Sequence, residues 1–178
     1  MSIAEKLTKI AKNEQKILEN TKSLVDGSIK QVVIPDGVQH IRGGAFYHCR
    51  ELTSVKIPDS VISIGIYAFY NCMGLTTIEI PDSVTAILFS AFEGCNHLTS
   101  VKIPDGVTSI EDYTFRYCRQ LTSVKIPDSV TSIGEYAFYQ CTNLTDVYYA
   151  GSQADWEKID IQSGNTSLTN STIHYNTK

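Results

Sequence analysis

One 23-residue unit is repeated along the chain, and this repetition limits the fold more than any other feature of the sequence. Residues 52–72 read LTSVKIPDSVISIGIYAFYNC, and residues 121–141 read LTSVKIPDSVTSIGEYAFYQC. A fixed period of this length is typical of a solenoid, in which each repeat buries its apolar face against its neighbours. Three residue types keep the step: Pro35, Pro58, Pro81, Pro104 and Pro127; Phe46, Phe69, Phe92, Phe115 and Phe138; Cys49, Cys72, Cys95, Cys118 and Cys141.

Each repeat predicts one short strand, a turn and a compact return. In LTSVKIP, Val124 and Ile126 alternate with Lys125, which is the period-two pattern of a half-buried strand. The proline that follows cannot donate to a sheet, so the strand should end there. The aspartate after each proline is expected to accept backbone N–H groups in the turn. The later apolar residues are spaced by three to four, which favours a helical or 3₁₀ return rather than a second long strand: Val130, Ile133, Ala137, Phe138 and Cys141.

The pattern LxxVxIPxxVxxIGxxAFxxC resembles the bacterial leucine-rich repeats usually called BspA-like, and the resemblance covers about residues 29–175. It implies an α/β solenoid of leucine-rich repeats that is right-handed and has a concave parallel β-sheet. It also implies a binding or adhesion module rather than an enzyme. Leu88 and Glu111 stand where other repeats have Gly65 and Gly134. We therefore expect that this position does not require a positive φ.

The sequence predicts three parts. Residues 28–143 hold five repeats, and residues 144–178 are expected to form a C-terminal capping repeat, because the end of a solenoid exposes core and strand edge. Strands are predicted there through Val147 and Tyr149 and again at Ile173 and Tyr175. Four apolar residues are expected to cover the last turn: Trp156, Ile159, Ile161 and Leu168.

Residues 1–27 differ from the repeats and predict an amphipathic helix from about residue 3 to 25. Ser2 and Glu5 form a capping box, and Gly27 suits the end of a helix. The helix could cap the first repeat or pair with copies of itself, and Glu14 and Thr21 interrupt a strict coiled-coil pattern, so both readings stand. The opening MSIAEKLTKIAKNEQKI also resembles tail-associated proteins from phages and prophages of Gram-positive gut bacteria.

Charge and hydropathy favour neither a nucleic-acid partner nor a membrane span. The net charge is −4, and the Lys and Arg residues are spread along the chain. The first residues lack the apolar region of an export signal, and no stretch approaches eighteen consecutive apolar residues. We expect reduced thiols in a cytoplasmic or virion setting, or a cell-surface setting if an export signal precedes this sequence.

The residues that usually carry chemistry predict no catalytic, cofactor or metal site. Cysteines 23 residues apart match no zinc motif, and equivalent positions in neighbouring turns lie about 4.8 Å apart, too far for a disulfide. We expect buried thiols that donate S–H to the backbone. The recurring aspartates lack the oxygen ligands that calcium prefers, and the four histidines have no matching partners. A hydrolase is a remote alternative, since a site built from distant turns leaves no linear trace.

Positions that vary between repeats predict where a partner binds. Exposed patches rich in aromatic residues are candidate interfaces, although these side chains could instead tuck under neighbouring turns or under the N-terminal helix. A second candidate is the concave face of the sheet, through which solenoids commonly bind. The candidate patch consists of Ile66, Tyr67, Tyr70, Phe89, Tyr113 and Tyr117, and the concave face of Lys56, Glu79, Lys102, Lys125 and Tyr148.

These observations predict a non-catalytic module that recognises a protein or a glycan. We expect residues 1–27 to attach it to a larger assembly, such as a phage or prophage tail, or to associate copies of the chain. The alternative within binding proteins is a bacterial surface adhesin or host-interaction protein.

Overall fold

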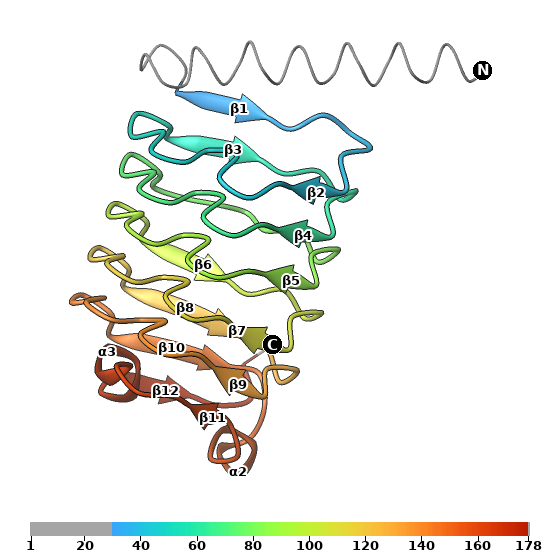
Figure 1. The fold of residues 1–178 in the computed structure, drawn as a ribbon. Coiled ribbons are helices and arrows are strands. Elements are labelled where there is room, and N and C mark those ends of the chain that lie inside the picture. The colour runs from blue at the N-terminus through green and yellow to red at the C-terminus, as the bar shows by residue number, and fades with distance from the viewer. Residues whose placement is uncertain (1–29, 178) are drawn as a thin grey trace, which may run out of the picture.

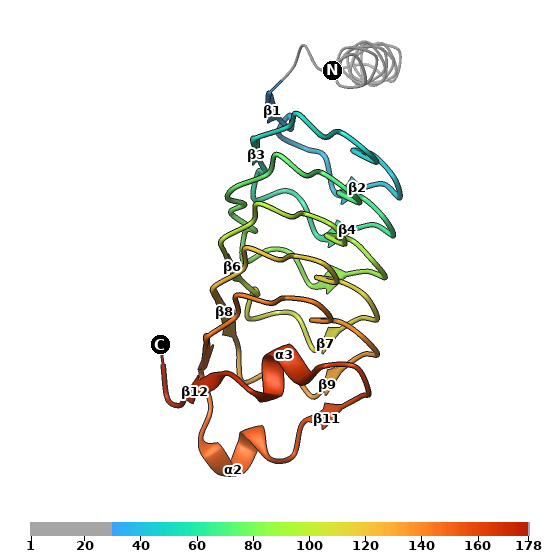
Figure 2. The ribbon, with the colours of Figure 1, turned by 90° about the vertical axis from the view of Figure 1, so that its left-hand side faces the viewer.

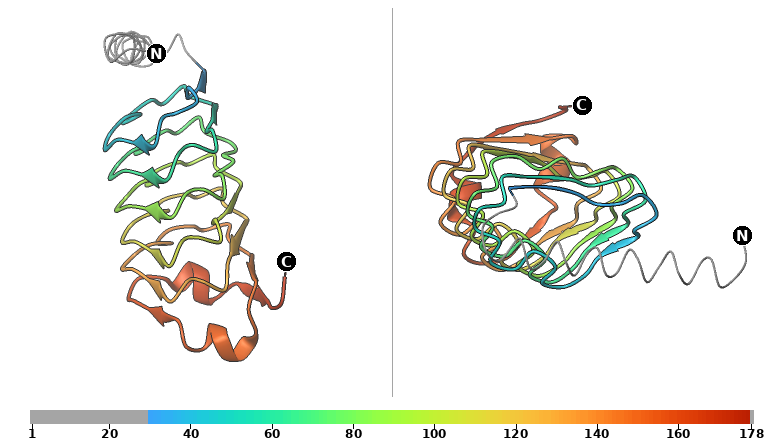
Figure 3. Two further views of the ribbon diagram at one scale, coloured as in Figure 1. Left: turned by 90° about the vertical axis from the view of Figure 1, so that its right-hand side faces the viewer. Right: turned by 90° about the horizontal axis from the view of Figure 1, so that it is seen from above.

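The chain folds into a solenoid in which each turn lies on the one before it (Figure 1). The structure is a computed structural model, and it describes residues 30–177. Seen from above, the successive turns follow nearly the same outline (Figure 3). The predicted parallel-sheet solenoid is thus confirmed, whereas its right-handed coil and the concavity of its sheet stay predictions. The helix predicted for residues 3–25 lies outside the described residues.

The strand predicted in each repeat is present along one side of the solenoid. Paired strands are parallel and in register. Val101, Val124 and Val147 follow one another at the 23-residue step, and Ile173 follows Val147 after 26 residues. In the turn between β3 and β6, the strand is reduced to one bridge from Lys56 to Glu79. These strands are β1 (Gln31–Val33), β3 (Ser54–Lys56), β6 (Ser100–Lys102), β8 (Ser123–Ile126), β10 (Asp146–Tyr149) and β12 (Thr172–His174).

A second set of short parallel strands lies on the opposite side of each turn, where we expected irregular returns (Figure 2). Each has two residues, of which the second is an isoleucine, as in Ser63–Ile64. A strand this short leaves no period-two pattern in the sequence. The set comprises β2 (His40–Ile41), β4 (Ser63–Ile64), β5 (Ala86–Ile87), β7 (Ser109–Ile110), β9 (Ser132–Ile133) and β11 (Asp160–Ile161).

The segment after this second strand is a run of turns, so the predicted helical or 3₁₀ return is wrong. Its amides alternate between two kinds of partner. Ala68 donates to the carbonyl of Gly65 within its own turn at 3.1 Å, whereas Phe69 donates to Ala91 of the next turn at 2.8 Å. A helix needs every amide to bond within the segment. Here the next turn has carbonyl groups opposite every second amide of this segment, and those amides donate to it.

The phenylalanine and cysteine columns lie in the core. The five phenylalanine rings are stacked, with centroids 5.0 to 5.6 Å apart. Each of the last four cysteines donates its S–H to the carbonyl of a phenylalanine in the turn before, at 3.0 to 3.3 Å, as Cys72 does to Phe46. Burial raises the pKa of these thiols, and that of Cys141 to about 12. The predicted buried thiols with S–H donors are confirmed.

The aspartate after each proline does not make the turn contact that we expected. No backbone N–H within residues 30–177 donates to any of these five carboxylates. In three of the five repeats a serine follows the aspartate, and its hydroxyl reaches the turn before: Ser60 donates to the carbonyl of Val38 at 2.9 Å, Ser83 to that of Val61 at 2.7 Å and Ser129 to that of Val107 at 2.7 Å. These serines therefore join neighbouring turns.

The last turn is covered by an irregular segment with two short helices, α2 (Gln153–Trp156) and α3 (Thr166–Thr169). Leu168 is fully buried, and Trp156 packs edge-on against Tyr149 with ring centroids 5.2 Å apart. Ile159 is buried, and Ile161 packs against the core. The predicted strands are present as β10 and β12, and the residues expected to cover the last turn do so. No helix within residues 30–177 has the length and hydropathy of a membrane span.

Asn165 completes the hydrogen bonding of the last return. In earlier turns, the amide of the core phenylalanine donates to a carbonyl of the next turn. Phe138 has no regular turn beyond it, and its amide donates to Asn165 Oδ1 at 3.0 Å. The side-chain amide donates to the carbonyls of Gly134 and Gln162, both at 2.9 Å. One buried side chain thus stands in for the missing turn.

Candidate binding surface

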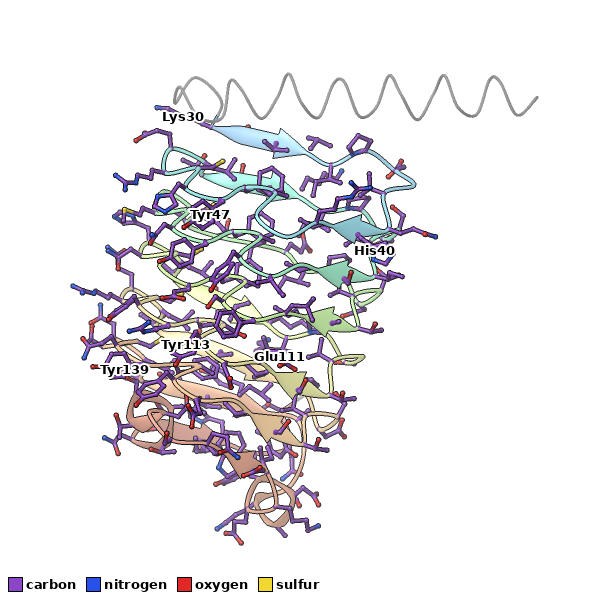
Figure 4. All side chains as sticks on the ribbon, in the orientation of Figure 1. Lys30, His40, Tyr47, Glu111, Tyr113 and Tyr139 are labelled. Carbon is purple, nitrogen blue, oxygen red and sulfur yellow. The ribbon has the colours of Figure 1, made fainter. Side chains whose placement is uncertain are left out.

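A row of aromatic side chains runs along the return side of the solenoid, and Figure 4 shows Tyr47, Tyr113 and Tyr139 following one another down the stack. Every member is exposed or half-buried, unlike the core phenylalanines. All of them lie in the run of turns after the second strand. We call the row the aromatic stripe, and it consists of Tyr47, Tyr67, Tyr70, Phe89, Tyr113, Tyr117, Tyr136 and Tyr139.

In the first half of the stripe, rings pack face to face and edge to face. Tyr47 and Tyr70 are stacked, with centroids 4.9 Å apart and ring planes within 9°. Tyr67 stands edge-on to Tyr70 at 5.4 Å and to Phe89 at 5.5 Å. Phe89 continues the row to Tyr113 of the next turn at 5.3 Å. These geometries are the favourable ones for aromatic pairs.

The second half continues without a break. Tyr113 and Tyr136 are stacked, with centroids 5.6 Å apart and ring planes within 4°. Tyr136 contacts Tyr139 edge-on at 5.4 Å, and Tyr139 contacts Tyr117 at 5.9 Å. Contacts therefore connect all the rings from Tyr47 to Tyr117, so the stripe is a packed surface and not a set of separate side chains.

Arg116 ties the second half of the stripe to a buried carboxylate. Its guanidinium carbon lies 4.6 Å from the ring centre of Tyr117, 5.2 Å from Tyr113 and 5.7 Å from Tyr139. Cation–π contacts of this kind contribute about 0.5 to 2 kcal/mol. Nη1 also lies 3.3 Å from a carboxylate oxygen of Glu93, whose side chain is 9% exposed. The pair neutralises both charges and holds the rings in place.

Four of the eight stripe residues have a left-handed backbone, which a bulky residue adopts at a cost of about 1 kcal/mol or more. Other turns use glycine at the same places in the repeat, at Gly44 and Gly94, where it is free of this cost. As expected, Gly65 and Gly134 do not have a positive φ. Rings kept at strained positions are typical of functional surfaces. The four are Tyr67 (φ 57°), Tyr113 (60°), Tyr117 (61°) and Tyr136 (55°).

Exposed aliphatic side chains adjoin the first half of the stripe in sequence: Ile66 precedes Tyr67, Leu88 precedes Phe89, and Ile62 lies four residues before Ile66. Ile62, Ile66 and Leu88 are 42%, 46% and 37% exposed. In later turns, the places of Ile66 and Leu88 in the repeat are taken by Glu135 and Glu111. The chain thus tolerates charge at these positions, yet keeps apolar residues in the second and third turns. We call Ile62, Ile66 and Leu88 the apolar flank.

All six residues of the predicted patch belong to this surface: Ile66 lies in the flank and the other five lie in the stripe. Their packing also partly matches the alternative reading, since most of the rings are half-buried by one another. The prediction missed Tyr47, Tyr136, Tyr139 and Arg116. The 23-residue step could have found all four, because Tyr47, Arg116 and Tyr139 share the place of Tyr70 in the repeat, and Tyr136 shares that of Tyr113.

The residues of the second candidate surface lie on two sheets, β1–β3 and β6–β8–β10–β12. Lys102 Nζ makes an exposed ion pair with Asp82 at 2.8 Å, which contributes about 0 to 1 kcal/mol. Tyr148 stacks on His174, with ring centroids 4.7 Å apart. The register aligns Val33, Lys56 and Glu79 on one side and Lys102, Lys125, Tyr148 and His174 on the other, and Lys102 follows Glu79 at the 23-residue step. We call them the sheet row.

Neither surface gathers the side chains of a metal site. Within residues 30–177, no three His, Cys, Asp or Glu side chains lie close enough to hold a metal ion. The buried thiols face backbone carbonyls and have raised pKa values, so at neutral pH they carry no thiolate.

The repeats match the family model described as the BspA type leucine rich repeat region, in six copies over residues 17–145. The chain belongs to this family. The matched region begins before residue 28, where we expected the repeats to start, and its first residues lie outside the described part of the chain. No curated protein matches the chain.

Three solved structures share the fold. A leucine rich cell surface protein from Faecalibacterium prausnitzii is 45% identical with a TM-score of 0.72, over 76% of this chain and 36% of that protein. A leucine rich repeat protein of T. pallidum is 37% identical with a TM-score of 0.64, over 67% of this chain and 58% of that protein. A leucine-rich repeat protein from Bacteroides ovatus is 26% identical with a TM-score of 0.60, over 83% of this chain and 42% of that protein. The chain thus spans less than two thirds of each. Fold and relatives together indicate a binding or recognition module, and none of these matches carries the resemblance to phage tails.

Proposed function

We propose that the chain is a non-catalytic recognition module that binds a protein or glycan partner through the aromatic stripe and the apolar flank. The observation that carries this proposal is the strained backbone of four stripe tyrosines. Glycine at those positions would remove the strain, and the chain itself uses Gly44 and Gly94 there. Tyrosine and arginine are also the residue types that dominate binding energy at protein interfaces.

The sheet row is the second candidate for the binding surface, because the curved sheets of solenoids commonly bind partners. Lys102 in this row is already paired with Asp82. Ring-to-ring packing in the row is limited to Tyr148 and His174, so the row lacks the continuous aromatic surface of the stripe.

A binding screen with matched variants tests the proposal. Wild type is compared on one panel of immobilised glycans and displayed peptides with a stripe variant, Tyr113→Ser with Ile66→Glu, and a sheet-row variant, Lys56→Glu with Lys125→Glu. Ser90 and Glu135 occupy the same places in other turns, so the stripe changes suit the fold. We expect wild-type ligands to bind the stripe variant at least about tenfold more weakly, a loss of about 1.4 kcal/mol.

The sheet-row variant should retain these ligands. If instead every wild-type ligand is retained by the stripe variant and lost by the sheet-row variant, the sheet row is the binding surface and the stripe proposal fails. Circular dichroism of both variants checks that the fold is kept.

The setting of the module is a separate proposal. The 45% identical relative is described as a cell surface protein, which favours the surface adhesin among the settings that we expected. The tail-associated setting depends on the resemblance of the first seventeen residues alone. In either setting, we propose that residues 1–27 attach the module to a larger assembly or associate its copies.

A further inference from the structure

The stripe presents little open ring face to a ligand. A sugar packs the C–H groups of its ring on an open aromatic face, which is the electron-rich side of the ring. In the stripe, Tyr70 is stacked on Tyr47 and Tyr136 on Tyr113, while Arg116 lies over Tyr117. Only Tyr47 and Tyr67 are more than one-third exposed among the stripe residues. The platform that a sugar needs is therefore mostly occupied by neighbouring side chains.

The groups that do reach the surface are phenol oxygens and aliphatic side chains. Within the described residues, the hydroxyl of Tyr117 accepts from Arg116 Nη2 at 3.1 Å, and no other stripe hydroxyl has a protein partner. None of these oxygens is among the buried unsatisfied atoms, so they are open to solvent. A row of phenol hydroxyls beside an aliphatic flank can hold a polypeptide backbone and its apolar side chains.

One position of the repeat on this surface changes from apolar to acidic along the solenoid. Ile66 and Phe89 occupy the same place in the repeat as Asp112 and Glu135 do in the next two turns. The Asp112 carboxylate accepts the backbone N–H of Glu135 at 2.7 Å, so these two acidic residues are adjacent. The column is thus apolar in its first half and acidic in its second half. Two turns correspond to about 10 Å, which is about three residues of extended chain.

We infer, on the basis of the proposed function, that the partner is an extended polypeptide with an apolar anchor and a Lys or Arg about three residues away from it. The anchor packs on Ile66 and Phe89. The basic residue lies against Asp112 and Glu135, where opposite charge fixes the register of the bound chain. The phenol hydroxyls bond to the backbone between the two.

A selection from a phage-displayed library of short random peptides tests this inference, alongside the array of immobilised glycans. We expect peptides selected on the full chain to be enriched in an apolar residue and a basic residue about three positions apart. Ile66→Glu should weaken them at least about tenfold, since it puts charge at the anchor site. Glu135→Gln should weaken them several-fold and reduce the effect of salt on binding. The sheet-row variant should bind them as wild type does.

The other outcomes are distinguishable. Glycans that bind wild type and are lost by the stripe variant, with no stripe-dependent peptide, overturn the polypeptide inference and leave the proposed function standing. Peptides that depend on Ile66 but show no basic residue and ignore Glu135→Gln overturn the assigned register. Ligands of either class that bind the stripe variant as tightly as wild type overturn both proposals.

Discussion

At the residue scale, the side chain of Asn165 supplies the hydrogen bond that a further turn would supply to Phe138, and the residues next to it in sequence do not suggest this role. It is 3% exposed and makes three hydrogen bonds, one as acceptor and two as donor. An amide side chain is suited to this position because it offers both an acceptor and donors, as a peptide group does. The regular ladder of the repeats therefore ends on a side chain that imitates the backbone.

Replacing this residue should destabilise the C-terminal end. In Asn165→Ala, the buried amide of Phe138 loses its acceptor, and we expect the free energy of unfolding to fall by about 2 to 3 kcal/mol. Urea unfolding followed by circular dichroism measures the change. The matched control is Asn143→Ala, an exposed asparagine that should change stability by less than about 0.5 kcal/mol. Equal losses in the two variants would contradict the role of Asn165.

At the element scale, the column of buried thiols repeats one polar contact, an S–H donated to a carbonyl, inside the core. From Cys72 to Cys141, each S–H donates to a carbonyl in the turn before, and a thiolate would have no proton to donate there. Burial also removes the water that would stabilise a thiolate, so the pKa of the folded thiol is raised. Solenoid stacking and thiol chemistry are therefore coupled.

Alkaline pH should reveal this coupling at Cys141. Its folded pKa is raised by burial to about 12, while a free thiol has a pKa of 9.0. The stabilisation is complete below pH 9 and is lost as the pH rises toward 12, because the unfolded chain releases the proton first. Between about pH 8 and pH 10, we expect wild type to lose about 1.4 kcal/mol relative to Cys141→Ser, whose hydroxyl does not ionise.

Urea midpoints of both proteins at the two pH values measure this difference. The comparison with Cys141→Ser removes the contributions of tyrosine and lysine, which both proteins share. A stability difference that does not change with pH would mean that the thiol ionises as easily in the folded protein as in the unfolded one.

At the scale of the whole molecule, the two ends of the described solenoid differ. The last turn is covered by α2, α3 and Asn165, whereas β1 pairs only with β3 among the described residues. Val33 in β1 is 69% exposed. Terminal repeats of a solenoid need cover, because they have a neighbour on one side only.

Removing residues 1–27 tests whether they supply this cover. We expect faster hydrogen exchange in β1 of the shortened chain, with β6 and β8 unchanged, because stability in a solenoid depends on nearest neighbours. Native mass by light scattering then separates the two proposed roles. An unchanged number of copies indicates a cap within one chain, and a fall in that number indicates association of copies. Unchanged exchange in β1 would show that residues 1–27 do not cover the first turn.

The sequence predicted the parts of the fold that repeat. Pro, Phe and Cys at one step defined the turns, the buried thiols and the first strands, because each of these features is encoded within a single repeat. It did not predict the second strands or the alternating amides of the return. Both features depend on carbonyl groups of the next turn. The spacing of apolar residues within one repeat does not reveal them, because this spacing is the same for a helix and for these turns.

The candidate surface was likewise predicted from the sequence only in part. The residues that vary between repeats could be read from the sequence, and Tyr67, Tyr70, Phe89, Tyr113 and Tyr117 are indeed connected ring to ring. The positive φ of the strained tyrosines was not predicted, because tyrosine itself does not mark it; the signal lies in other turns, which have Gly44 and Gly94 at the same places.

By itself, the sequence determined that this protein is a stack of 23-residue turns with a column of thiols and phenylalanines inside. Only the tertiary structure decided which group each amide and each ring meets in the next turn. The spacing of residue types can be read within one repeat of the sequence. These contacts instead join residues about one repeat apart, and they depend on how closely the turns approach each other. For this reason Arg116 among its tyrosines, and Asn165 beneath the last turn, became visible only when the turns were stacked.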